Sequence, residues 1–240
     1  MNEGNKLSSG KSTIAEVLAQ FLADQRERLT PKTFTRYDYV IELLQHCLDG
    51  YAYQSLNKAD AKLFDRFFNA KGDEHREFCQ IFGPEHILPN VGEFLDYFII
   101  RKVIAGKDLL RAAGTVTKKL AAWLAEKGYA DAADVEYAKE RGVAAVRDLP
   151  KAEELARCLR SFAEDQERGS EDDEIESHFM LTRVELGKIW LEGMDGRELG
   201  PIRVPEEISR RCQVGWTISG VVGRLGKRWQ IVETWNVYPG

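Results

Sequence analysis

The stretch "EDQERGSEDDEIES", residues 164–177, decides the fold, because the spacing of apolar residues changes across it. Before it, apolar residues recur three or four positions apart, which is typical of helices that bury one face. After it they recur at every second position, as at Met180, Thr182 and Val184, which is typical of strands. The stretch itself is dense in acidic side chains and predicts a solvated linker. We therefore expect an α+β chain in two parts, an all-α helical bundle followed by a small β-structure.

The helical part carries helix-start signals. Thr13 and Glu16 form the pattern of a capping box ahead of an apolar run. Thr30 as an N-cap, with Pro31 at the first helical position, predicts the second helix. A further helix is expected at 59–69, with one apolar face formed by Leu63, Phe64, Phe67 and Phe68. Another is expected to begin at a Thr115 N-cap and to end at Gly128. The remaining helices are expected at 91–104, 131–141 and 150–167.

The part after the linker predicts a small β-barrel of the SH3-like or OB-like kind, because five or so short strands fill about sixty residues. Strand alternation places Trp216 and Trp229 inside such a barrel, and leaves open where Trp190 and Trp235 lie. The expected divisions of the chain are a disordered tail (1–12), a helical domain (13–130), connecting helices (131–163), the acidic linker (164–177) and the barrel (178–240).

Charge is unevenly distributed along a chain of 240 residues with a net charge of −5. Residues 101–150 carry 10 basic against 7 acidic side chains and residues 201–240 carry 6 against 3, whereas 151–200 carry 7 against 14. Such asymmetry favours a nucleic-acid-binding face. The four cysteines form no C-x-x-C pair and predict reduced thiols in a cytoplasmic protein. The longest apolar run is too short to cross a membrane.

Several chemical motifs can be excluded as sites. "GKST" at 10–13 resembles the end of a phosphate-binding loop, but Gly4 stands one residue too far from Gly10, so we expect no nucleotide. His75 and Cys79 are four apart and would share a helix face, but without a second ligand pair we expect no metal. No hydrolase, zinc-protease or dinucleotide motif occurs in the sequence. We therefore predict no cofactor.

Two stretches carry a family resemblance. "TIAEVLAQFLADQRERLTPKTFTRYDYVIELL" (13–44) and "TVTKKLAAWLAEKGY" (115–129) resemble the N-terminal, SAM-like core-binding domain of tyrosine recombinases, the phage-integrase family. The resemblance covers about residues 13–130, roughly half of the chain. In that family the domain forms half of a clamp around duplex DNA, with the second and last helices directing their N-terminal ends at the phosphates.

The resemblance implies DNA contacts at two helix starts, where hydroxyl and free N–H groups bind phosphate and cations add attraction. It nominates Lys32, Thr33, Thr35 and Arg36 on the second helix and Thr115, Thr117, Lys118 and Lys119 on the last, and Arg101, Lys102, Lys107 and Arg111 would widen the basic patch. The alternative is that the threonines are only caps and the lysines only a solvated face.

The catalytic domain of that family has no counterpart in this sequence. The chain has no Arg-His-x-x-Arg cluster, and residues 131–240 are few and largely strand-like. Tyr238 resembles a nucleophile by position, but a tyrosine without a phosphate clamp cannot cleave a phosphodiester. We therefore predict that the protein is not an enzyme.

Two hypotheses follow. The first is a non-catalytic protein that binds duplex DNA through the helical domain, with the barrel as an auxiliary contact at Arg224, Lys227 and Arg228. The second is an interaction scaffold that has lost DNA binding and docks or self-associates through the barrel and the helix at 150–167, whose apolar stripe is thin. Under the first hypothesis Lys32, Arg36, Lys118 and Lys119 converge on one concave surface; under the second they are scattered or paired, and an apolar patch lies elsewhere.

Overall fold

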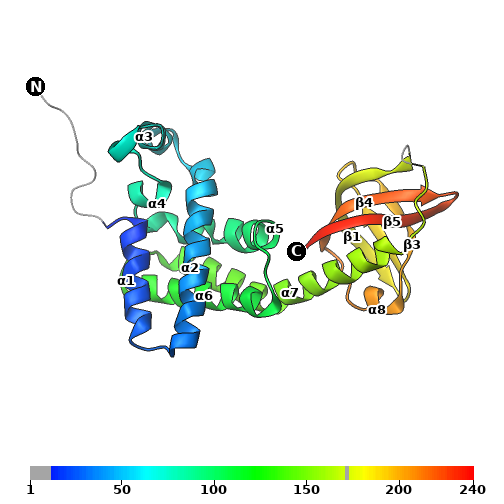
Figure 1. Cartoon of the computed structure of the whole chain (residues 1–240), viewed down its shortest axis with the longest axis horizontal. Coiled ribbons are helices and arrows are strands. Elements are labelled where there is room, and N and C mark those ends of the chain that lie inside the picture. The colour runs from blue at the N-terminus through cyan, green and yellow to red at the C-terminus, as the bar shows by residue number, and fades with distance from the viewer. Residues whose placement is uncertain (1–11, 171–172) are drawn as a thin grey trace, which may run out of the picture. The chain divides into compact units, whose positions relative to one another are not determined.

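The computed structural model describes residues 12–170 and 173–240, so the expected tail lies outside the described residues except for Ser12. The chain divides into two compact units. The helical unit comprises residues up to 99 together with 108–146, and the sheet unit comprises 100–107 and 147–240. Figure 1 shows the helices and the sheet of these units.

The helical unit begins with the two helices whose starts the sequence predicts. In α1 (Ile14–Arg26) the Glu16 N–H donates to Thr13 Oγ1 at 3.3 Å, and the Thr13 N–H donates to the Glu16 carboxylate at 2.8 Å. In α2 (Pro31–Tyr51) the Thr33 N–H donates to the N-cap Thr30 hydroxyl at 3.4 Å. Both predicted caps are confirmed, because N-capping depends on neighbouring residues alone.

The remaining helices of this unit are shorter or differ in extent from the prediction. They are α3 (Lys58–Phe68), α4 (Phe78–Ile81), a π-helical turn (Glu93–Phe98), α5 (Ile99–Arg101), α6 (Lys107–Glu126) and the first part of α7 (Ala132–Glu164), with 3-10 turns at Ala52–Ser55, Gly72–Glu74, Pro84–His86 and Leu88–Asn90. On α3 only Phe64 is buried, and Leu63 and Phe68 are exposed, which corrects the expected apolar face.

The core of the helical unit joins α1 and α2 to α6. Phe21 of α1 is fully buried, and its ring lies edge-on to Trp123 of α6 at 5.5 Å between centroids. The indole N–H of Trp123 donates to Asp24 Oδ2 at 2.9 Å, so its polar group is also satisfied. α6 meets α7 at two glycines, since a Cβ at Gly114 would lie only 2.5 Å from the Gly142 carbonyl oxygen.

Helix α7 replaces the two helices expected at 131–141 and 150–167. It is one helix of 33 residues, and Pro150 lies inside it. Gly142 lies inside this helix, where the absence of a side chain permits the close approach of α6. The residues that were expected to link separate helices therefore continue as helix, and strand structure begins at Ile175, within the expected linker.

The sheet unit is one antiparallel sheet with strand order β3-β2-β1-β4-β5. Its strands are β1 (Ile175–Glu185), β2 (Lys188–Glu192), β3 (Glu198–Arg203), β4 (Thr217–Leu225) and β5 (Arg228–Tyr238), with the short helix α8 (Glu206–Ser209) after β3. β3 and β5 approach each other, but they form no strand pair among the described residues, so the sheet is not closed. The expected antiparallel strands are therefore present, but the sheet is not closed into a barrel.

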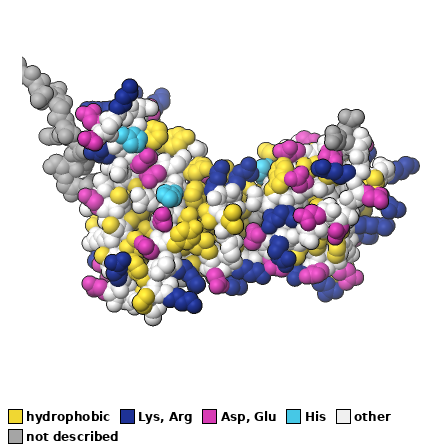
Figure 2. Space-filling view, viewed as in Figure 1, with side chains coloured by type: hydrophobic (Ala, Val, Ile, Leu, Met, Phe, Trp, Pro, Cys, Tyr) yellow, Lys and Arg dark blue, Asp and Glu magenta, His cyan; other side chains and the backbone are white. Residues whose placement is uncertain are grey.

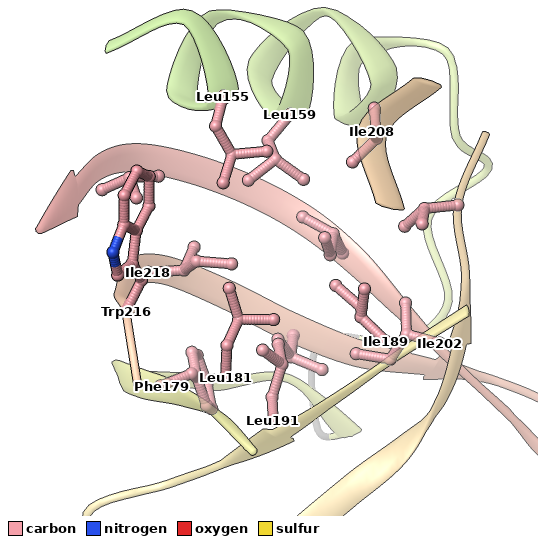
Figure 3. Packing of buried hydrophobic residues seen from close by; sticks show 14 of the residues in the cluster. Leu155, Leu159, Phe179, Leu181, Ile189, Leu191, Ile202, Ile208, Trp216 and Ile218 are labelled. Carbon is pink, nitrogen blue, oxygen red and sulfur yellow. The ribbon is translucent and has the colours of Figure 1, made fainter. Parts of the chain in front are cut away.

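The C-terminal part of α7 covers the apolar face of the sheet. Leu155 and Leu159 are fully buried and point from this helix toward the sheet, opposite Ile218 (Figure 3). The apolar stripe that we expected to pack weakly or to seek a partner is thus covered by the chain's own sheet. The helix and the sheet therefore bury their apolar side chains against each other.

Two expectations about the environment can be compared with the structure. Cys47, Cys79, Cys158 and Cys212 are all free thiols. Within residues 12–170 and 173–240, no helix has the length and apolar character needed to cross a membrane.

Candidate nucleic-acid interface

At the start of α2 the predicted hydroxyl groups are already engaged within the helix. Thr33 shares a hydrogen bond of 3.0 Å with the Thr30 hydroxyl, and Thr35 Oγ1 donates to the Pro31 carbonyl at 3.0 Å. Lys32 and Arg36 are exposed, and neither forms an ion pair with another residue that the structure describes. The two cations are therefore available to an anionic ligand, whereas the two threonines act as local helix contacts.

The predicted start of the last helix is wrong. α6 begins at Lys107, so Thr115 lies in its third turn and donates to the Arg111 carbonyl at 2.9 Å. Thr117 is buried and donates to the Ala113 carbonyl at 2.9 Å, so it cannot reach a phosphate. The sequence "Gly-Thr" resembles a helix boundary, but Gly114 lies inside α6, where the absence of a side chain permits close contact with α7.

The basic residues of α6 lie on different faces. A Cβ at Gly142 would lie 2.5 Å from Lys118 Cγ, which places the Lys118 stem over α7. Arg111 lies 3.8 Å from the Asp108 carboxylate, which offsets part of its charge. Lys119 instead lines a hollow of about 300 Å³ together with Gln25, Arg28, Leu29, Tyr37, Ala122, Trp123 and Glu126. Lys118 and Lys119 therefore lie on different parts of α6, and Lys119 meets Arg28 in the hollow.

The sheet unit gathers its predicted residues more closely. A hollow of about 370 Å³, which we call the Trp229 hollow, lies beside the hairpin that joins β4 to β5. It is lined by Gln166, Gly200, Pro201, Arg203, Leu225, Lys227, Arg228, Trp229 and Gln230. Three of these residues are cations, and the described residues that line the hollow include no carboxylate. Figure 2 shows Lys and Arg side chains gathered at this end of the sheet.

Trp229 is half-buried, which corrects its expected place inside the core. Its ring packs against the core on one side and lines the hollow on another. The Arg224 guanidinium lies 4.2 Å from the ring centroid, and the Arg197 guanidinium lies 5.9 Å from it. Both distances are within the range of cation–π attraction, so the indole holds these two cations beside the hollow.

Five cations thus lie at the Trp229 ring or line its hollow: Arg197, Arg203, Arg224, Lys227 and Arg228. None of the five forms an ion pair with a residue in the described ranges. Unpaired cations repel one another, and a bound anion relieves that repulsion. The arrangement is suited to a polyanion with an aromatic group.

The other tryptophans of the sheet unit occupy distinct environments. Trp216 is buried, as predicted. Trp190 packs against Gly200, where a Cβ would lie 2.6 Å from the indole, and its ring carries the Arg183 guanidinium at 4.5 Å. Trp235 lines a second hollow of about 440 Å³, which we call the Trp235 hollow. Strand alternation could not place these rings, because bulges interrupt the register of β1 with β2 and of β4 with β5.

None of the residues weighed for catalysis or metal binding is among the described residues that line these hollows. His75 bonds the Phe68 carbonyl at 2.8 Å and the Glu77 carboxylate at 3.1 Å, and the Glu77 contact raises its pKa. Cys79 is fully buried, and burial raises the pKa of its thiol. The ring of Tyr238 lies 5.8 Å from that of His178. The structure therefore gives each of these residues contacts with its own neighbours.

Comparisons with known proteins leave the resemblance as a hypothesis. No protein-family model, no curated protein and no solved structure matches this chain.

Proposed function

We propose that this chain is a non-catalytic nucleic-acid-binding protein and that its principal contact surface is the Trp229 hollow. The observation that carries the proposal is the gathering of Lys227, Arg228 and Arg203 around one half-buried indole, with no carboxylate among the described lining residues. Cations attract the phosphate backbone through the release of its counterions, and an indole face stacks on a base. A hollow that offers both groups is suited to nucleic acid.

The helical unit is proposed as the auxiliary contact, which reverses the roles expected from the family resemblance. Lys32 and Arg36 remain available near the turn between α1 and α2, and Arg28 and Lys119 share a hollow. Glu126 lines the same hollow, so its net charge is lower than that of the Trp229 hollow. If the core-binding resemblance reflects function, these residues contact duplex DNA more weakly than the sheet unit does.

The test is a titration of labelled oligonucleotides by the full chain, followed by fluorescence anisotropy across a salt series. The variant Lys227→Gln/Arg228→Gln removes two cations from the hairpin. Each phosphate contact contributes about 0.7 to 0.9 to the slope of log K against log salt, so the double variant should lower that slope by roughly 1.4 to 1.8. Affinity should fall for every sequence tested, because the lost contacts are to phosphate.

The matched control is Lys58→Gln/Lys62→Gln, which makes the same change in net charge on exposed lysines of α3. It should leave both the affinity and the salt slope near those of the wild type. Lys32→Gln/Arg36→Gln measures the auxiliary contact and should lower the slope less than the hairpin variant does. Equal losses in all three variants, or no binding at low salt, would refute the proposal.

A second candidate function, docking of a protein partner, is favoured by the exposed aromatic residues around α3. Tyr53 and Phe68 are each more than 40% exposed, and both stack on buried Phe64, with centroids at 5.5 and 4.9 Å. Exposed aromatic rings are typical of interface anchors. Sedimentation of the wild type and of Phe68→Ser at increasing concentration tests self-association, and an unchanged monomer in both cases removes that form of docking.

A further inference from the structure

The two hollows of the sheet unit lie along one strand and share a residue. β5 is an edge strand of the sheet. The Trp229 hollow is lined by Arg228, Trp229 and Gln230, and the Trp235 hollow is lined by residues 232–235 of the same strand. Gln166 lines both hollows. The hollows are therefore neighbouring parts of one groove beside β5.

The Trp235 hollow differs from the Trp229 hollow in its charges. It is lined by Arg160, Ala163, Glu164, Gln166, Arg168, Val232, Glu233, Thr234 and Trp235. Its arginines are largely compensated, since Arg160 bonds Glu153 at 3.1 Å and Arg168 lies 3.6 Å from Glu174. A hollow with both signs of charge is poorly suited to a phosphate and better suited to a neutral group that donates and accepts hydrogen bonds.

Thr234 lines this hollow and carries a buried hydroxyl that has no partner among the described residues. Its side chain is 1% exposed, and its hydroxyl forms no hydrogen bond with any described residue. A buried polar group without a partner is costly, so its retention calls for an explanation. A hydroxyl both donates and accepts, which matches the edge of a nucleobase.

The indole of Trp235 is hydrogen-bonded to a neighbouring side chain of the same strand. Its N–H donates to Glu233 Oε1 at 2.7 Å, and its backbone carbonyl accepts from Arg160. Trp229 lies six residues earlier on the same strand, which corresponds to about 20 Å along β5. Two indoles at this separation, one beside unpaired cations and one beside Thr234, offer stacking positions to successive parts of an extended chain.

We infer that the Trp235 hollow is a base-binding subsite of this groove and that the ligand class is single-stranded nucleic acid. The inference rests on the proposed function. Phosphates lie against Arg203, Lys227 and Arg228, and an unpaired base enters the Trp235 hollow and packs against Trp235. Entry of the base shifts the side chains that cover the Thr234 hydroxyl, and the uncovered hydroxyl bonds the edge of the base. Duplex bases stack on one another and are hydrogen-bonded to their partners, so they cannot enter such a hollow without being extruded.

The experiment compares a labelled mixed-sequence 12-nucleotide single strand with the 12-base-pair duplex of the same sequence, both titrated with the full chain. We expect the single strand to bind about tenfold more tightly. Thr234→Val should weaken single-strand binding about threefold or more and leave duplex binding unchanged. The same variant should melt at an equal or higher temperature than the wild type, because it removes an unsatisfied buried hydroxyl.

A second pair of variants tests the indole. Trp235→Ala should weaken single-strand binding about fivefold or more, and Trp235→Phe, which keeps an aromatic face, should restore most of it. Equal binding of single strand and duplex, or an unchanged single-strand affinity in Thr234→Val and Trp235→Ala, would overturn this inference and leave the proposed function intact. Absence of binding by both oligonucleotides would overturn the proposed function itself.

Discussion

Replacing Gly114 by alanine tests the contact that joins α6 to α7. A Cβ at this position would lie 2.5 Å from the Gly142 carbonyl oxygen, 2.9 Å from the Val146 nitrogen and 3.0 Å from the Ala145 Cβ. The first distance is 0.9 Å shorter than the 3.4 Å at which ordinary contact begins. Two of the three atoms are backbone atoms, so rotation of a side chain cannot relieve the clash.

The expected change in stability combines two opposing effects. Forcing an extra methyl group into a packed interior costs about 1–3 kcal/mol. Alanine in a helix interior gains about 1 kcal/mol over glycine. Because the clash is with backbone, we expect the upper part of the first range and a net loss of roughly 1–2 kcal/mol in the free energy of unfolding. Urea denaturation of the full chain, followed by circular dichroism at the helical band, measures it.

Gly50→Ala is the matched control for this variant. Gly50 lies in the last turn of α2, and a Cβ there would meet no atom within 4 Å. This variant should be as stable as the wild type or up to about 1 kcal/mol more stable, because only helix propensity changes. If Gly114→Ala is also as stable as the wild type, the argument from the close approach of α6 and α7 is wrong.

Three further predictions concern titrating groups. Lys107 and Arg157 hold the pKa of Glu154 at about 2, below its ordinary 4.5. The ionised carboxylate therefore stabilises the fold above pH 4.5, and this contribution is lost as the pH falls toward 2. In Lys107→Met, the stability measured by denaturation should depend less on pH over that range. Glu77 raises the pKa of His75 above its ordinary 6.5. The contact therefore stabilises the fold below pH 6.5, and this stabilisation is lost as the pH rises through the raised pKa. In Glu77→Gln, the pKa of His75 measured by NMR titration should lie closer to 6.5. Burial raises the pKa of Cys79, so iodoacetamide at pH 8 should label this thiol after denaturation and leave it unlabelled in the native protein.

The helix starts show how far local sequence carries a prediction. Thr13 and Thr30 cap α1 and α2 as predicted, because the donor and acceptor of an N-cap lie three residues apart. Thr115 has the same residue type after a glycine, yet it lies in the middle of α6. Gly114 does not mark a helix boundary. It lies in close contact with Gly142, which is 28 positions later in the chain.

The candidate site was predicted in part. Lys227 and Arg228 follow Gly226, and a turn flanked by alternating apolar residues predicts an exposed hairpin tip from neighbouring residues alone. Alternation placed Trp229 in the core, whereas the ring lies between core and hollow. Arg203 and Gln166 belong to β3 and to the segment after α7, so only the folded sheet brings them to the same hollow.

The sequence by itself determined the division into helices and antiparallel strands, the capped starts of α1 and α2, and the cationic hairpin. Each of these follows from the spacing of residues within a few turns or one hairpin. Only the tertiary structure decided that α7 is continuous, that the sheet is not closed, that Leu155 and Leu159 cover it, and that Thr234 and Trp235 line a hollow. These features depend on which distant surfaces compete for the same apolar contacts, and residue spacing does not report that competition.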